Sequence, residues 1–442
     1  MTETLRRHRW LAMLLALLLV AGACGRDDDG GDDDASGSDD TSDEMDDGDE
    51  EMVEPSPGIT DDSIKIGATY PLSGNASAYA VISQALDACF DEVNENGGIE
   101  MADGQTRTIE FIIKDDGYVP DTAVANAQAL VEQDEVFMIL NPLGTANNAA
   151  IREYMNGQEV PQAFVASGAS LWGAQHEEYP WTLGWQPSYP TESSIYAEFL
   201  QEQFPDGATV AILFQNDSYG EDYVTGFESA IEGTNIEIVA RESYEATDPT
   251  VDSQIVNLAQ SGADVFFNVT TPTAAAQAVR AVGESNWEPL HLLNSVSNSK
   301  VGVLEPAGLE NAEGIYTTLY LKDPSDAQWE DDEAMASYFE SAEQYGDFEP
   351  RNGFGVFGYS VCDTTVKVLQ DMPEPTRESF QETADNMDYE LPLALPGISV
   401  KTGEGDTFPI EAMQIAQFNG GTWELQGEVL DFEGETPVPE GE

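Results

Sequence analysis

The sequence predicts an α/β protein with two doubly wound lobes, each a parallel sheet flanked by helices. From residue 63 onward, short apolar runs alternate with amphipathic helical stretches, which is typical of parallel strands joined by helices. The 442 residues leave room for two or three domains. The elements exceed one sheet of ordinary size, so we expect two lobes.

The elements follow one another in strict alternation. Residues 63–70 form an alternating apolar strand, and the helix expected over 76–96 carries its apolar residues on one side. Gly97 and Gly98 end this helix, because glycine tolerates the left-handed cap. Further strands are expected at 108–114, 136–140, 160–166, 209–214, 236–240, 264–269 and 290–293. Further helices are expected at 121–133, 146–156, 219–231, 251–260, 273–285 and 356–369.

The chain is strongly acidic, with 84 Asp and Glu against 16 Lys and Arg and a formal net charge of −68. Such a polyanion repels nucleic acid and anionic lipid heads, which excludes functions that need a basic surface patch. Residues 55–442 alone hold 67 acidic residues against 12 basic ones, so the excess belongs to the folded body. We interpret it as adaptation to a salty medium, where counterions screen self-repulsion.

The first sixty residues predict export and a membrane anchor. Three arginines precede the apolar run 10–21, which is short for a membrane span and has the layout of a secretory signal. The run ends in Ala21-Gly22-Ala23-Cys24, which resembles the lipobox of bacterial lipoproteins and implies cleavage before a lipidated Cys24. Plain secretion is the alternative. Residues 24–60 are predicted to be an acidic, disordered tether, because they offer almost nothing to bury.

Small and hydroxylated residues mark four strand-to-helix junctions. In doubly wound sheets, ligands bind outside the carboxyl ends of the strands, where backbone N–H groups of the following helices point outward. Each junction alone is also explained as a plain helix cap, but four of them in one alternating chain favour a ligand site. The junctions are 73–75, 143–145, 167–170 and 270–272.

Several short motifs together resemble the type I periplasmic solute-binding proteins of branched-chain amino-acid ABC transporters, over roughly residues 62–400. They are Ile64-Lys65-Ile66-Gly67, Pro71-Leu72-Ser73-Gly74, the stretch 91–99, Lys114-Asp115-Asp116, and Asn216-Asp217-Ser218-Tyr219-Gly220. The resemblance implies two lobes joined by three hinge crossings near residues 186, 316 and 398. It also implies lobe closure over a small solute, which is then delivered to an ABC permease with its ATPase.

With these crossings the expected division is a signal peptide at 1–23, the tether at 24–60, and two lobes. Residues 61–186 and the return 317–397 would form the first lobe. Residues 187–316 and the return 398–442, with the C-terminal tail, would form the second. We expect an extracytoplasmic monomer that touches the membrane only through its lipid anchor.

The resemblance also implies which residues bind the solute. Backbone N–H groups and hydroxyls of the first lobe would hold a carboxylate at helix N-termini. From the first lobe these residues are Tyr79, Gly144, Thr145, Gly168 and Ser170, with Phe354 from the returning segment against an apolar tail; from the second lobe they are Tyr219, Thr271 and Asn294.

One departure from the family pattern affects the choice of solute. Amino-acid binders of this family present an acid from the second lobe to the ligand's ammonium, but no Asp or Glu lies between Glu288 and Glu305. A buried ammonium without a carboxylate would be poorly compensated. Branched-chain or other amino acids, amides and carboxylic acids therefore all remain candidates, and Asn294 with Ser295 would serve an uncharged polar group.

Two cysteines remain after the lipidated Cys24. Cys89 lies on the first helix and Cys362 on helix 356–369, which the family returns to the first lobe, so the two can form a disulfide outside the cytoplasm. Two buried free thiols are the alternative.

We expect no catalysis, metal or cofactor. The three histidines lie far apart, and neither a nucleophile elbow nor a phosphate-binding loop is present. The run Gly353-Phe354-Gly355-Val356-Phe357-Gly358 matches a dinucleotide-binding pattern, but an acidic helix precedes it instead of a strand. The rival functions are a ligand-sensing subunit of a membrane signalling protein and, third, a cell-surface hydrolase.

Overall fold

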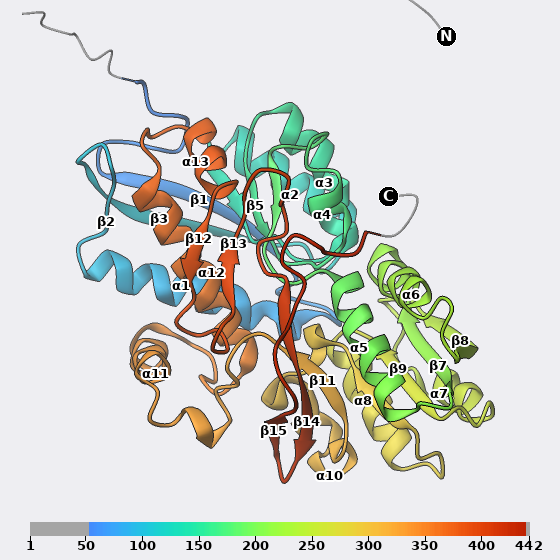
Figure 1. Ribbon diagram of the computed structural model, residues 1–442. Helices are drawn as coiled ribbons and strands as arrows, with labels where there is room; N and C mark the ends of the chain where they lie inside the picture. The colour runs from blue at the N-terminus through green and yellow to red at the C-terminus, as the bar shows by residue number, and fades with distance from the viewer. Residues whose placement is uncertain (1–52, 439–442) are drawn as a thin grey trace, which may run out of the picture. The chain divides into compact units, whose positions relative to one another are not determined.

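The computed structural model describes residues 53–438, and two sheets hold most of their strands (Figure 1). The first sheet is six-stranded, in the order β2-β3-β1-β4-β5-β6. All its neighbours are parallel except β2 and β3. Its strands are β1 (Ser63–Tyr70), β2 (Ile99–Glu100), β3 (Thr106–Asp115), β4 (Met138–Leu140), β5 (Gln162–Val165) and β6 (Thr182–Gly184).

The second sheet is eight-stranded, in the order β15-β14-β11-β10-β9-β7-β8, with β16 paired to β14. Strands β7 to β11 are parallel, whereas β14 and β15 run antiparallel at one edge. The strands are β7 (Ala208–Gln215), β8 (Ile236–Tyr244), β9 (Val265–Val269), β10 (Leu290–Leu293), β11 (Tyr316–Leu319), β14 (Ala412–Asn419), β15 (Thr422–Leu425) and β16 (Leu430–Asp431). A separate hairpin pairs β12 (Asp388–Glu390) with β13 (Ser399–Lys401).

Helices flank both sheets (Figure 1). They are α1 (Ala80–Glu95), α2 (Pro120–Glu132), α3 (Thr145–Gly157), α4 (Leu171–Ala174), α5 (Tyr189–Gln203), α6 (Ser218–Ala230), α7 (Asp252–Ala259), α8 (Pro272–Gly283), α9 (Glu305–Ala307), α10 (Leu309–Ala312), α11 (Glu333–Tyr345), α12 (Gly353–Asp371) and α13 (Arg377–Ala384). Across residues 53–438, none of them combines the length and apolar character that crossing a membrane requires.

Strand β7 shows why this sequence needs helices on both faces of the sheet. Successive side chains of a strand point to opposite faces. Val210 and Ile212 belong to the core cluster that includes residues of α5 and α6, whereas Ala211 and Leu213 belong to the cluster that includes residues of α7 and α8. Because both faces are apolar, both must be covered by helices.

The predicted α/β class with two parallel-sheet lobes is confirmed. The chain passes from β6 of the first sheet to α5 and β7 of the second, and it leaves the second sheet after β11. It then forms α11 and α12, which pack against α1, before it re-enters the second sheet as β14. The predicted lobe limits at residues 186, 316 and 397 stay a prediction; strand β11 itself continues to Leu319.

Some elements differ from the sequence prediction. The helix expected over 76–96 starts as a short 3-10 turn, Ser77–Tyr79, before α1. Helices α5 and α11 and the antiparallel pair β14–β15 carry no sequence prediction. Sequence analysis did not predict helix α5 because its buried residues, which include the charged Glu192, do not follow an amphipathic period.

The predicted signal peptide and the lipidated Cys24 lie outside the described residues, as does most of the predicted tether. The last part of the tether, however, is attached to the body. The Ser56 amide donates to the carbonyl oxygen of Pro375 (3.0 Å), and Ser56 Oγ accepts from the Arg377 amide (3.0 Å). Ile59 is buried. Residues before the predicted limit at residue 60 therefore already pack against the body.

Close packing of α1 against α12 explains the glycine motif at 353–358. A Cβ atom at Gly358 would lie 2.6 Å from the carbonyl oxygen of Ile82 on α1, so only glycine fits there. Gly358 of the motif therefore serves helix packing. A disulfide between Cys89 of α1 and Cys362 of α12 joins the same two helices.

We predict that this disulfide stabilises the protein strongly. It connects residues 273 positions apart, and closing so long a loop in the unfolded chain is worth about 5 kcal/mol. Urea unfolding with and without reductant measures the loss, and a Cys89→Ala/Cys362→Ala variant should be insensitive to reductant. An unchanged midpoint in a sample shown to be fully reduced would contradict the prediction.

Candidate functional site

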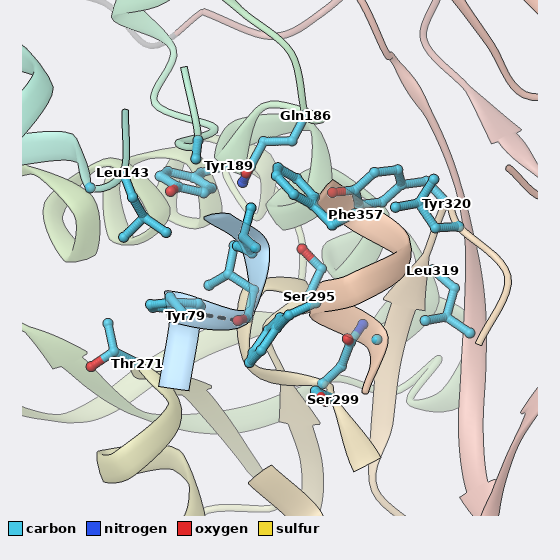
Figure 2. Close-up of a pocket in the computed structure, with 18 of the residues that line it drawn as sticks. Tyr79, Leu143, Gln186, Tyr189, Thr271, Ser295, Ser299, Leu319, Tyr320 and Phe357 are labelled. Carbon is cyan, nitrogen blue, oxygen red and sulfur yellow. Dashed lines mark hydrogen bonds between the residues drawn. The ribbon is translucent and has the colours of Figure 1, made fainter. Parts of the chain in front are cut away.

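A cavity of about 910 Å³, part of which opens to solvent, lies between the two lobes (Figure 2). Both lobes and the segments that cross between them supply its wall. The first lobe contributes Tyr79, Ile82, Tyr118, Leu143, Gly144, Thr145, Ala166, Gly353, Phe354 and Phe357. The second lobe contributes Tyr189, Tyr219, Thr271, Ser295, Val296, Asn298, Ser299, Leu319 and Trp423, and the crossing segments contribute Gln186, Tyr320, Leu321, Lys322 and Asp323. The wall is mainly aromatic and apolar.

Six of the nine predicted ligand residues lie together in this wall: Tyr79, Gly144, Thr145, Tyr219, Thr271 and Phe354. Tyr79 reaches across the cavity, where its hydroxyl donates to the carbonyl oxygen of Val296 (3.1 Å). Its ring packs against Phe354 with centroids 5.1 Å apart. The aromatic part of the wall is therefore built from segments far apart in the sequence.

The junction at Gly144 requires glycine. Its φ is +98°, and a Cβ atom there would lie 2.6 Å from the Tyr118 ring. The absence of a side chain leaves the backbone at the start of α3 accessible from the cavity. The Thr145 hydroxyl pairs with Ser167 Oγ (2.7 Å), which fixes the first residue of the helix.

The other three predicted ligand residues do not line the cavity. Gly168 packs against the first crossing, because a Cβ atom there would lie 2.3 Å from the carbonyl oxygen of Pro187. Ser170 donates through its amide and hydroxyl to the carboxylate of Asp222 on α6 (2.9 and 2.7 Å). Asn294 is buried behind the wall, where its amide oxygen accepts a hydrogen bond from the Tyr219 hydroxyl. These residues hold the wall in place.

The segment around Asn294 contains no acidic residue of its own, but helix α5 places one beside it, Glu192. Glu192 is buried, and its carboxylate accepts hydrogen bonds from the Ser295 amide and hydroxyl and from the Tyr223 hydroxyl, at 2.6 to 2.7 Å. The Tyr196 hydroxyl lies 2.8 Å from Glu192 and 2.8 Å from the carbonyl oxygen of Leu293, and its single proton is shared between them. Burial raises the pKa of Glu192, while these hydrogen bonds act in the opposite direction. All its oxygens are occupied, so Glu192 fixes Ser295 in the cavity wall. Glu192 lies about a hundred residues before Ser295 in the sequence, so sequence analysis did not predict this contact.

Hydrogen bonds to residues outside the cavity wall position two wall residues of the second lobe, Thr271 and Tyr219. Thr271 donates through its amide to the Tyr244 hydroxyl (2.9 Å) and through its hydroxyl to the Gln215 side chain (3.3 Å). Asp217 of the predicted Asp-Ser-Tyr-Gly motif caps α6 by accepting from the amides of Tyr219 and Gly220 (3.1 and 3.3 Å). The motif therefore sets the position of Tyr219.

Two charged residues lie in the wall. Lys322 donates to the carboxylate of Asp332 (2.7 Å) and to the carbonyl oxygen of Pro392 (2.8 Å), so its charge is already paired. Asp323 accepts from the Ser325 amide (2.8 Å), while its second oxygen is enclosed by protein without a hydrogen-bond partner among residues 53–438. Burial raises the pKa of Asp323.

Hydrogen bonds outside the cavity wall also join the two lobes. The Asn75 side chain donates to the carbonyl oxygens of Ala246 (3.0 Å) and Asp248 (3.3 Å). The Thr273 hydroxyl donates to the carbonyl oxygen of Asn75 (2.6 Å). The loop after β1 is thus bound to the loop after β8 and to α8. This arrangement of two hinged lobes, closed over a cavity that both of them line, defines a ligand-binding protein that encloses its ligand.

Comparison with known proteins agrees with this class. The family model described as periplasmic binding protein matches residues 63–422, so the chain belongs to the periplasmic binding protein family and is an extracytoplasmic protein. A relative, the leucine-, isoleucine-, valine-, threonine-, and alanine-binding protein of Pseudomonas aeruginosa, is 22% identical over 346 residues, which cover 77% of this chain and 87% of the relative.

Solved structures share the fold at low identity. The fatty acid ABC transporter substrate-binding protein from Thermomonospora curvata has a TM-score of 0.73 and 20% identity, covering 88% of this chain and 98% of that one. A branched chain amino acid ABC transporter protein from Thermus thermophilus, solved with bound valine, has a TM-score of 0.74 and 15% identity, covering 84% and 97%.

We predict that Asn75→Ala shifts the lobes toward an open form. The substitution removes two hydrogen bonds between the lobes, each worth about 1 kcal/mol, without altering the cavity wall. Small-angle X-ray scattering should therefore give a larger radius of gyration for the variant.

Asn386→Ala is the matched control, because the Asn386 side chain donates to Glu382 of its own helical segment, away from the lobe contact. The prediction is wrong if both variants scatter like the wild type.

Proposed function

We propose that this protein is the solute receptor of an ABC importer, which encloses a small, largely apolar molecule carrying a carboxylate or amide and delivers it to the permease. The observation that carries the proposal is the aromatic cavity lined by both lobes. A ligand that contacts both lobes favours the closed form, and a permease that recognises only this form takes up loaded receptor. The relatives named above, for branched-chain amino acids and for a fatty acid, support transport as the role.

The wall favours an apolar ligand with one anionic end. The start of α3 at Gly144 and Thr145 offers backbone N–H groups and the positive end of a helix dipole, both suited to a carboxylate. Phe354, Phe357 and Leu319 offer apolar surface for the remainder. A carboxylic acid with a sizeable apolar part is the chemical class that fits best.

We further propose that the protein releases its ligand unchanged and remains monomeric, and that lipidation of Cys24 holds it near the permease. A lipidated N-terminus and a tether would keep the receptor near the membrane, where its partner lies.

Ligand binding is tested by thermal shift with carboxylic acids of increasing chain length in high salt, followed by calorimetry. A ligand at a hundred times its Kd should stabilise the protein by about 2.7 kcal/mol, and mass spectrometry should recover it unchanged. Failure of every acid and amide to bind contradicts the receptor, and turnover of a bound compound favours a hydrolase.

We predict that Phe354→Ala weakens binding of such an acid by about 2 kcal/mol, because it removes buried aromatic surface from the cavity. Phe339→Ala is the control. Phe339 lies on α11, where it packs beside Arg351 and Tyr338, and it does not line the cavity. Equal losses in the two variants would mean that the effect of Phe354 is on stability and not on the ligand.

A further inference from the structure

Two polar side chains in the cavity wall have no hydrogen-bond partner within the described part of the chain. They are Gln186, on the segment that joins β6 to α5, and Tyr320, which directly follows β11. Both are only partly buried, and neither appears among the polar atoms that the protein encloses. The Gln186 amide and the Tyr320 hydroxyl are thus polar groups of the wall that are free to bind a ligand.

Both side chains come from the segments that cross between the lobes and line the cavity. Trp185, the neighbour of Gln186, packs edge-on against Tyr320 with centroids 6.3 Å apart and against Phe357 at 5.1 Å. Figure 2 shows the Gln186 side chain extending toward Tyr189, and the Tyr320 ring directed toward Phe357. The hydroxyl of Tyr320 also lies close enough to Glu192 and Tyr189 to feel their charge.

Most other polar side chains of the wall already have partners. The Tyr79 hydroxyl donates to Val296, the Tyr219 hydroxyl to Asn294, and Thr271 Oγ1 to Gln215. Ser295 is held by Glu192, and Lys322 by Asp332. The unpartnered oxygen of Asp323 is enclosed by protein, so a ligand in the cavity does not reach it.

We propose that Gln186 and Tyr320 form a specificity subsite that binds an uncharged polar group of the ligand with both a donor and an acceptor, such as a carboxamide. This inference rests on the proposed receptor function and narrows its ligand class: an apolar carboxylic acid that carries a second, neutral polar group.

The chemistry of the two side chains explains the choice. A glutamine amide offers donors and an acceptor, and a tyrosine hydroxyl offers one of each, so a carboxamide satisfies both. Burial, followed by the nearby Glu192, raises the pKa of Tyr320 well above its ordinary value, which keeps the hydroxyl neutral. A second carboxylate placed here would lose its hydration without gaining an opposite charge. A plain hydrocarbon chain would leave both polar groups unpaired.

The test uses four ligands of matched length, which are the monoamide of adipic acid, 6-oxoheptanoic acid, heptanoic acid and adipic acid. The same four compounds are also measured with chains one and two methylenes longer or shorter. The ketone keeps the acceptor of the amide but lacks its donors. Calorimetry with the wild-type protein should show the monoamide binding roughly tenfold tighter than the ketone, the plain acid and the dicarboxylate, as two net hydrogen bonds allow.

Two variants connect this preference to the subsite. Tyr320→Phe removes only the hydroxyl and keeps the ring that packs on Trp185, and Gln186→Leu removes the amide at similar size. In each variant the ratio of the ketone Kd to the amide Kd should fall, to within about twofold of unity when both are combined. Tyr345→Phe, whose hydroxyl contacts Glu95 outside the cavity, should keep the wild-type ratio.

The possible failures are distinguishable. If the wild type binds the acids but does not prefer the amide, or if the double variant keeps the preference, the subsite is wrong while the receptor function stands. If no acid or amide of any length binds, the receptor function fails, and the subsite fails with it.

Discussion

The packing of Trp185 is the constraint on which the two-lobed arrangement depends. Its side chain is fully buried where the first crossing leaves β6, and its indole Nε1 donates to Thr364 Oγ1 of α12 (3.0 Å). Its ring contacts Tyr320 of the second crossing and Phe357 of α12. One aromatic side chain thereby ties the first crossing, the second crossing and the returning helix together. The second connection is in turn hydrogen-bonded to the chain that returns from the first lobe, through Leu395 and Tyr320 and through Lys322 and Leu393 (2.9 Å each). The segments that join the lobes are therefore tied to one another by direct contacts.

Two charged groups in the interior of this strongly acidic chain are compensated by their neighbours. Glu192 is buried among four hydrogen-bond donors, and Lys322 is paired with Asp332. Since unpaired buried charges are costly, the ligand that enters this interior has to bring little uncompensated charge of its own, apart from an end that helix N-termini can hold. The charge of the surface and the selectivity of the cavity are consequently separate properties of the chain.

The fold was predictable because the alternation of strands and helices follows from local periodicity, as in β7 with its two apolar faces. The site was predictable where it lies at strand-to-helix junctions, as at Gly144 and Thr145. It was not predictable where it depends on side chains that meet only after folding. Glu192 reaches Ser295 from a helix without an amphipathic period, and Ser170 turns toward Asp222 because a carboxylate lies across the lobe boundary. Gln186 and Tyr320 lie on connecting segments, which carry no pattern of their own, and the packing of Trp185 against Tyr320 brings these segments into contact.

The disulfide between α1 and α12 has a consequence for how the chain is made. It joins the beginning of the first lobe to a helix that is synthesised only after strands β7 to β11 of the second lobe. The first lobe is thus completed late, after most of the second lobe's strands have been made. Oxidation of Cys89 and Cys362 would then be a late step of maturation, which links α1 to α12 covalently after α12 has packed against the first lobe.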